Sequence, residues 1–354
     1  MKCNNNETND YTLFNYLKPT ENDDLSKLNS SDLQDFIIIL NSFYLQLREK
    51  IGINNDITFG IEIELENARY KKIQKEINAL SLKNKYIVKD DCSLNRGCEI
   101  NSPILKDHKT CWKNIHKVCN SINKLAIVGK NSGGHIHIGT QTLGNNSLSW
   151  YNLGKIWQVY ENVIYRFLWG EYLIGRNSIS KYARPIAENL IKEYRNLSKN
   201  STFQDIFRSI RIDGDKYKAI YFGNVDTTSL NRLSGKNTIE FRCPNSTINP
   251  VIWQNNINLL TKLLIYCRSS NYNNDIVEKR YNYNIKNIYY KNDIYNEIFL
   301  DQVLEFVDLI FNNNLDKIYF LKQYLKSFEI ADSSSKFKKT KVKDFTHNGF
   351  IKLK

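Results

Sequence analysis

The chain has 354 residues, of which 50 are Lys or Arg and 37 are Asp or Glu, so its formal net charge is +13 at pH 7. Hydrophobic residues make up 41% of it, which permits a large core and excludes a globally disordered chain. No apolar run approaches the roughly 18 residues of a membrane-spanning helix, and the first residues lack the apolar core of a signal peptide. We therefore expect a cytoplasmic protein that does not enter a membrane.

The positive charge and the seven cysteines both have ordinary explanations. Asn makes up roughly one residue in eight, and Lys and Ile are also frequent, which is typical of an AT-rich genome and raises the Lys count without any functional demand. The number of cysteines is odd and no C-x-x-C pair occurs, so neither a disulfide framework nor a zinc knuckle is expected. Nucleic acid is therefore not the expected partner.

The predicted elements mix helices and strands without a regular βαβ alternation. Apolar residues at helical spacing predict a helix from Leu33 to Leu47, behind a cap at Ser30–Asp32. Further helices are expected at residues 68–82, 107–125, 147–170 and 250–265, and as an amphipathic pair within 300–328. Strands are expected at residues 58–66, 86–89, 98–101, 134–139, 217–222 and 238–243. This mixture favours an α+β fold with a largely antiparallel sheet.

The strand at residues 58–66 carries the most informative pattern. Apolar side chains alternate there with Glu62, Glu64 and Glu66, so the three carboxylates share one face at intervals of about 7 Å. A solvated edge face is one interpretation, although such a face normally mixes charges of both signs. The other interpretation is a platform for a divalent cation such as Mg²⁺, which prefers oxygen ligands. Glu66 has no assigned role.

Two further strands present polar side chains on one face only. His135 and His137 are two of the five histidines, and they alternate with isoleucines between flanking glycines, which favours a site. Glu240 and Arg242 share a face of the strand at 238–243 in the same way. They either pair with each other or act as a metal carboxylate beside an anion-binding arginine.

A fourth segment, residues 90–103, contains Asp91 and places Glu99 in a strand whose other face is apolar. Neither a Gly-rich phosphate loop nor a nucleophile elbow occurs in the chain, so any phosphate would be handled by metal ions and arginine. Together, the four segments would suit a concave sheet that holds several metal ions.

These segments, in this order, resemble the amidoligase family, which belongs with glutamine synthetase and glutamate–cysteine ligase to the carboxylate–amine ligases. The resemblance covers roughly residues 57–265 and rests on the motifs at 60–64, 91–103, 133–139, 176–185 and 238–249. It implies a twisted, mainly antiparallel sheet that forms a half-open funnel, as in the catalytic domain of glutamine synthetase, with helices packed outside.

The resemblance also implies a reaction. A carboxylate would attack the γ-phosphate of ATP, assisted by two or three Mg²⁺ or Mn²⁺ ions, and an amine would then displace phosphate to form an amide or isopeptide bond. The substrate would be an amino acid, peptide or protein that carries the carboxylate and the amine. A phosphotransferase on the same fold, similar to a guanidino kinase, is the alternative enzyme.

By this analogy, five residues would hold the metal ions. Glu62 and Glu64 would bridge the metal positions, and Glu99 would bind the ion on the substrate side. His135 and Glu240 would bind the ion on the nucleotide side.

The analogy also assigns the remaining polar residues. His137 would lie near the ATP phosphates, and Arg176 and Arg184 would hold the phosphate tail, with Arg184 also a candidate catalytic residue. Arg242 would hold the substrate carboxylate or the transferred phosphoryl group, and Asp91 is the candidate base for the amine. The family pattern predicts Asn at the position of Tyr221, so either the register shifts or the pocket differs.

We expect five regions along the chain. They are a polar, mobile N-terminal segment (1–30), an N-terminal helix (31–56), an amidoligase-like catalytic domain (57–270), a C-terminal helical extension packed on it (271–332) and a basic tail (333–354). The tail interleaves Lys with Phe337 and Phe345, so a non-catalytic protein that binds nucleic acid or another polyanion is a further alternative. A solvated terminal charge run is the commoner meaning of such a tail.

Overall fold

A computed structural model describes residues 22–82, 85–91, 93–94, 96–123, 125–128, 131–172, 175–176, 179–228, 230, 237–289, 294–326, 329–331 and 339–341. Six strands form one sheet in the order β2-β3-β1-β4-β6-β5, and every neighbouring pair is antiparallel. These strands are β1 (Phe59–Leu65), β2 (Ile87–Asp91), β3 (Gly97–Asn101), β4 (Gly134–Gly139), β5 (Ile220–Tyr221) and β6 (Thr238–Phe241). The α+β fold with an antiparallel sheet is confirmed.

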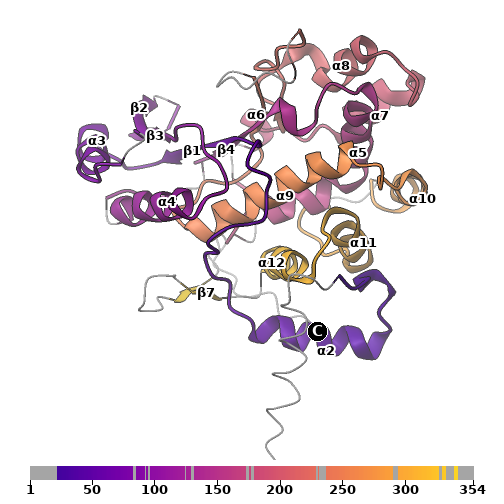
Figure 1. The fold of residues 1–354 in the computed structure, drawn as a ribbon, viewed down its shortest axis with the longest axis horizontal. Coiled ribbons are helices and arrows are strands. Elements are labelled where there is room, and N and C mark those ends of the chain that lie inside the picture. Colours follow the sequence, from indigo (N-terminus) through magenta and orange to yellow (C-terminus); the bar gives the residue numbers. More distant parts are fainter. Residues whose placement is uncertain are drawn as a thin grey trace, which may run out of the picture.

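The helices that accompany this sheet are α2 (Ser30–Ser42), α3 (Tyr70–Ala79), α4 (Lys109–Ile122), α5 (Ser147–Leu168), α6 (Ile179–Tyr182), α7 (Ala187–Glu193), α8 (Phe203–Arg211), α9 (Pro250–Arg268), α10 (Asn274–Asn287), α11 (Leu300–Ile310) and α12 (Asn314–Leu325). Most of them lie below the sheet or to its right in Figure 1, while α3 lies at its left end beside β2. A separate ribbon pairs β7 (Glu329–Ala331) with β8 (Lys339–Lys341). No helix in these ranges is both long enough and apolar enough to span a membrane.

The apolar face of the sheet is buried against three helices. Phe59 of β1 stacks on Trp112 of α4 with ring centroids 5.5 Å apart, and Phe241 of β6 stacks on Trp157 of α5 at 6.0 Å. The α9 helix packs so closely on β4 that a Cβ at Gly134 would come within 2.6 Å of an indole ring. Because α4, α5 and α9 cover this face, the polar side chains of the alternating strands point away from the core.

The first helix differs from its prediction at both ends. Its N-cap is Asn29, whose side chain accepts hydrogen bonds from the backbone of Ser31 and Asp32 at 2.9 Å, so the predicted cap residues Ser30–Asp32 form the first turn of α2. It ends at Ser42 instead of Leu47. The backbone beyond it is extended and bonds to other helices, as when the Arg48 amide donates to Gln254 of α9 at 2.7 Å.

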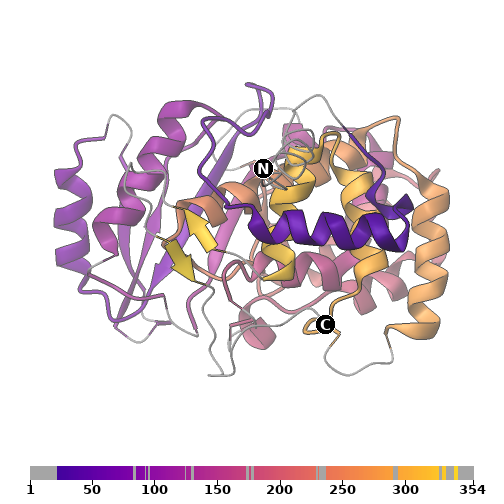
Figure 2. The ribbon, with the colours of Figure 1, turned by 90° about the horizontal axis from the view of Figure 1, so that it is seen from below.

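The last two helices only partly match the predicted amphipathic pair. The α11 helix has one exposed side, but α12 is buried around most of its circumference, including Lys317 and Lys322. Their ammonium groups donate to Asp308 and to the backbone carbonyl of Leu40 respectively. The segment of Asp23 and the helix α11 cover α12 at Lys317, and α2, which lies along the outer side of α12 (Figure 2), covers it at Lys322, where sequence periodicity predicted solvent.

Parts of both terminal predictions lie outside the described residues. Of the N-terminal segment, residues 22–30 are described, and Asp23 and Leu25 are held against α12 and α11. Leu25 is buried and its amide donates to Asp308, while the Asp23 amide donates to Asn314 at 2.8 Å. Of the basic tail, only β8 is described. The aromatic residues Phe337 and Phe345, on which the polyanion hypothesis depended, lie outside the described ranges.

Candidate active site

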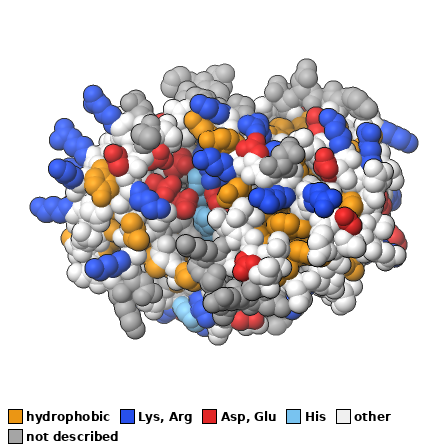
Figure 3. All heavy atoms as spheres, turned by 90° about the horizontal axis from the view of Figure 1, so that it is seen from above, with side chains coloured by type: hydrophobic (Ala, Val, Ile, Leu, Met, Phe, Trp, Pro, Cys, Tyr) orange, Lys and Arg blue, Asp and Glu red, His pale blue; other side chains and the backbone are white. Residues whose placement is uncertain are grey.

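The polar face of the sheet brings together residues from three of the predicted segments. In the register of β1 with its two neighbours, Glu64 lies opposite Glu99 of β3, and Glu62 lies opposite His135 of β4. Figure 3 shows carboxylates and imidazoles gathered in one hollow of this face, with Lys and Arg side chains around it. The shared face predicted for Glu62 and Glu64 is therefore present.

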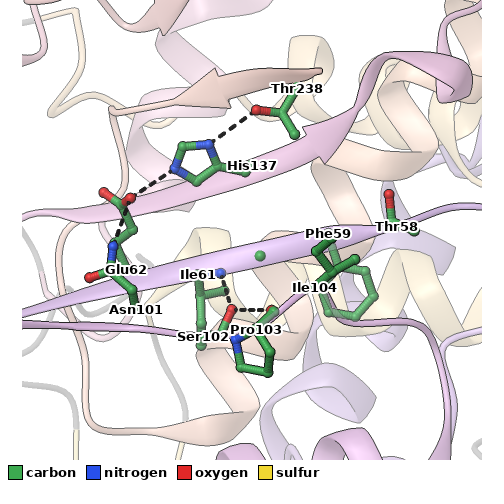
Figure 4. A pocket seen from close by; sticks show the side chains of 11 residues that line it. Thr58, Phe59, Ile61, Glu62, Asn101, Ser102, Pro103, Ile104, His137 and Thr238 are labelled. Atoms are coloured by element: carbon green, nitrogen blue, oxygen red, sulfur yellow. Dashed lines mark hydrogen bonds and ion pairs between the residues drawn. The ribbon is translucent and has the colours of Figure 1, made fainter. Parts of the chain in front are cut away.

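Glu62 contacts both imidazoles of β4 in this hollow. One carboxylate oxygen lies 2.7 Å from Nδ1 of His135, and the other lies 3.1 Å from Nε2 of His137 and accepts a hydrogen bond from Asn101 at 3.2 Å. Figure 4 shows His137 between Glu62 and Thr238. Burial raises the pKa of Glu62, but the two imidazoles lower it by a larger amount. The resulting pKa is well below the usual range of a glutamate.

A fourth strand, β6, completes the row. His137 of β4 lies opposite Glu240 of β6 in the sheet register. Asn224, which follows β5, donates to Glu240 at 3.1 Å. Burial lowers the pKa of His137, but Glu62 and Glu240 raise it more, so the net shift is upward. The row of site residues thus extends from β3 to β6.

Three groups of ligand atoms in the described part of the chain lie close enough to hold a metal ion, with all atoms of a group within 4.8 Å of one another. They are Glu62–Glu99–His135, Glu62–His137–Glu240 and Glu64–Asp91–Glu99. All five predicted metal ligands are present in these groups, but the partners differ from the analogy. His137, instead of His135, stands with Glu240, and Asp91 joins the two carboxylates on the β3 side.

The charges and contacts of the donor atoms, in addition to their grouping, favour a divalent cation at this site. Glu64 and Glu99 face each other directly, although like charges in that position destabilise a sheet. Burial and the charge of Glu62 raise the pKa of Glu99. Among the described residues, the buried Nε2 atoms of His135 and His137 face only carboxylates, at 3.4 Å from Glu64 and 3.1 Å from Glu62 respectively, without aligned hydrogen-bond geometry. The carboxylate oxygens of these groups are ligands that Mg²⁺ and Mn²⁺ prefer.

Two of the three predicted arginines lie at this site. Arg242 forms an ion pair with Glu240, so the predicted pairing within the strand exists, yet its buried Nε has no hydrogen-bond partner among the described residues. Arg176 is 2% exposed, donates to the backbone carbonyl of Arg242 at 2.9 Å and lies 3.6 Å from Glu64. A Cβ at Gly133 would collide with its guanidinium, so only glycine permits this approach.

Arg184 does not line the hollow. It forms an ion pair with Asp215, and its backbone bridges to Lys218 just before β5. These contacts connect two segments that are distant in the chain. The phosphate and catalytic roles of Arg184 stay predictions.

Two cavities open on the polar face, and Glu62 lines both of them. One has a volume of about 730 Å³ and is lined by Glu64, Asp91, Glu99 and Arg242 among others. The other, of about 170 Å³, is lined by His137, Thr238 and the β1 backbone around Gly60 (Figure 4). The metal-ligand row therefore separates a larger cavity from a smaller one.

Several polar residues of the site were missed in the sequence. Asn101 lies two residues after Glu99 and so shares its face, a signal that the alternation contained. Asn224 follows Tyr221, where the family pattern predicted Asn, and it contacts Glu240 from the loop beyond β5. Lys181 and Lys216, which line the larger cavity, carried no local signal.

The polar face of the sheet thus presents three groups of ligand atoms beside two cavities. Residues 80–264, just over half of the chain, match the family model described as "Putative amidoligase enzyme". The chain belongs to this amidoligase family, and the family's description indicates a ligase that forms amide bonds. The match begins after β1, the strand that carries Glu62 and Glu64. No curated protein matches the chain significantly.

Replacing Glu99 by Gln is expected to stabilise the metal-free protein by up to about 1 kcal/mol, because the change removes one charge of the facing pair. It also removes a carboxylate from two of the three groups. Mg²⁺ or Mn²⁺ should therefore raise the melting temperature of Glu99→Gln less than that of the wild type. Scanning fluorimetry with and without the ion measures both effects.

Glu66→Gln is the matched control. Glu66 continues the acidic row and accepts a hydrogen bond from Asn131, but it belongs to none of the three groups. Mg²⁺ or Mn²⁺ should raise the melting temperature of Glu66→Gln as much as that of the wild type. If the ion raised the melting temperature of Glu99→Gln by the same amount, the metal assignment would be contradicted.

Proposed function

We propose that the protein is an ATP- and Mg²⁺-dependent carboxylate–amine ligase that forms an amide or isopeptide bond through an acyl phosphate. The observation that carries this proposal is the row of cation groups on one sheet face, between the two cavities. Such a row allows a nucleotide and an acceptor to approach the same metal positions from opposite sides. A half-open funnel around the row belongs to the proposal.

The cation ligands are assigned from the three groups. Glu62, His137 and Glu240 would hold the nucleotide-side ion, and Glu64, Asp91 and Glu99 would hold the substrate-side ion. Divalent cations bound there would neutralise the phosphates of ATP. Asp91 is grouped with two other carboxylates, so this proposal makes it a ligand of the substrate-side ion. It also remains the candidate base for the amine.

The reaction has two displacement steps. An oxygen of the acceptor carboxylate attacks the γ-phosphorus of ATP, and ADP leaves with the electrons of the broken P–O bond. The amine nitrogen then attacks the acyl carbon, phosphate leaves, and the nitrogen loses a proton to the base. Arg242 orients the acceptor carboxylate or the transferred phosphoryl group, since its guanidinium lines the larger cavity and has an unpartnered Nε.

The test is to incubate the protein with ATP, Mg²⁺ and a pool of cell metabolites and to identify products by mass spectrometry. We expect ADP, free phosphate and a product whose mass equals that of two metabolites minus water. Glu240→Ala, which removes a ligand of the nucleotide-side group, should abolish all three. A product heavier than one metabolite by a phosphoryl group, without free phosphate, would overturn the ligase in favour of a phosphotransferase.

A further inference from the structure

Two lysines and two tyrosines form a cationic face on the larger cavity. Tyr182 at the end of α6 meets Tyr217 before β5, with ring centroids 5.4 Å apart and the rings edge to face. The ammonium of Lys181 lies 4.8 Å from the centroid of Tyr182, and that of Lys216 lies 5.1 Å from the centroid of Tyr217. Each cation is thus placed by the face of a ring.

Backbone pairing holds the two halves of this face together. Arg184 and Lys218 form a parallel bridge, in which the Arg184 amide donates to the carbonyl of Tyr217 and the Ala219 amide donates to the carbonyl of Arg184, both at 2.9 Å. The ion pair of Arg184 with Asp215 reinforces the junction. The Lys–Tyr pairs therefore come from two segments that are distant in the chain but fixed relative to each other.

The cationic face and the acidic row line the same cavity of about 730 Å³. Arg176 and Arg242 also line it, but they lie beside Glu64 and Glu240 respectively. In contrast, neither Lys181 nor Lys216 has a carboxylate partner among the described residues, and both are exposed. Their positive charge is available to an anionic group of a bound molecule.

We propose that Lys181 and Lys216 bind a second anionic group of the acceptor, so that the substrate class is a short acidic peptide. This inference rests on the proposed ligase function, in which one carboxylate of the acceptor reacts at the metal row. The cavity volume lies within the range of about 300–1,000 Å³ typical of small-molecule sites, which accommodates a peptide of a few residues. The tyrosine rings would cover the apolar stems of its side chains.

The phosphates of ATP are the other possible source of negative charge. The arrangement favours the acceptor, because His137 and Thr238, which line the smaller cavity near the nucleotide-side group, do not line the cavity of the lysines. An experiment must nevertheless measure the two ligands separately.

The test measures the binding of triglutamate, triglutamine and Mg²⁺·ADP by isothermal titration calorimetry, in the presence of excess Mg²⁺. We expect the wild type to bind triglutamate but not triglutamine. Lys181→Met/Lys216→Met should raise the Kd for triglutamate at least about tenfold and leave the Kd for Mg²⁺·ADP unchanged. Lys181→Arg/Lys216→Arg keeps both charges and should retain most of the affinity for triglutamate.

Lys71→Met/Lys75→Met is the matched control, because it removes two exposed lysines of α3 and lowers the net charge equally. It should bind triglutamate as the wild type does. Equal affinity of the wild type and Lys181→Met/Lys216→Met for triglutamate, or no binding of triglutamate by the wild type, would overturn the proposal. A loss of Mg²⁺·ADP affinity with triglutamate unchanged would assign the lysines to the nucleotide instead.

The metabolite assay separates this inference from the proposed function. If a condensed product forms but its acceptor carries a single carboxylate, the substrate class is wrong while the ligase function stands. If no condensed product forms, the ligase function fails, whatever the triglutamate titrations show.

Discussion

Replacing Glu62 by Gln is expected to lower metal-dependent turnover of ATP by on the order of a hundred- to a thousandfold. Glu62 belongs to two of the three cation groups and contacts both His135 and His137. The amide keeps the shape of the side chain but loses its charge and one acceptor oxygen. Initial rates of ADP release at a series of Mg²⁺ concentrations measure the loss.

Two observations distinguish a lost ligand from a damaged fold. Glu66→Gln makes the same chemical change in the same acidic row, outside the cation groups, and should retain turnover within about threefold. The thermal unfolding of Glu62→Gln should remain cooperative in the metal-free protein. If Glu62→Gln turned over ATP as fast as Glu66→Gln, the assignment of Glu62 to the metal positions would be wrong.

Replacing Asp316 by Asn is expected to lower the free energy of unfolding by about 3–5 kcal/mol. Asp316 is buried at the start of α12, where it forms ion pairs with Arg48, at 2.7 Å, and Lys262 of α9, and accepts a hydrogen bond from Asn258 at 2.8 Å. The amide would leave two cations without a counter-charge in the interior. Urea unfolding at neutral pH measures the loss.

An exposed aspartate provides the control for this change. Asp275 lies in the first turn of α10, as Asp316 does in α12, but it is exposed. Asp275→Asn should therefore cost less than about 1 kcal/mol. A loss in Asp316→Asn no larger than in Asp275→Asn would contradict a stabilising role for the buried ion pairs.

The same residue predicts a pH dependence. Burial raises the pKa of Asp316, but Arg48 and Lys262 lower it more, so the folded pKa lies below the value of about 3.9 expected in an unfolded chain. Its stabilisation is therefore complete above that unfolded value and is lost as the pH falls toward the folded pKa. The stability difference between wild type and Asp316→Asn should shrink over this acidic range.

The alternation of polar and apolar residues was enough to predict the site strands. In β1, β4 and β6 one face is apolar because α4, α5 and α9 cover it, so the period of two was visible in the sequence and placed Glu62, Glu64 and the two histidines correctly on shared faces. Pattern alone does not specify which strands are neighbours. The grouping of Glu240 with His137 depends on the register of β4 with β6, which only the fold defines.

Other features depended on contacts between distant segments. The α10 helix buries little of its surface, chiefly through Val277 and Asn284, so its sequence lacks a clear apolar stripe. Arg184 matched a family motif, but its partner Asp215 lies far along the chain. The buried lysines of α12 are surface residues by type, and they become interior residues because distant segments cover them, α2 at Lys322 and α11 with Asp23 at Lys317.

The position of β1 links the assembly of the sheet to the binding of metal. Although β1 is the first strand along the chain, it lies inside the sheet, between β3 and β4. Each of the three cation groups takes a ligand from it, either Glu62 or Glu64. A folding intermediate in which β3 and β4 have not closed around β1 therefore contains no complete ligand set. We therefore expect a cation to bind only after the sheet has closed. The bound cation should slow unfolding of the sheet more than it speeds its formation.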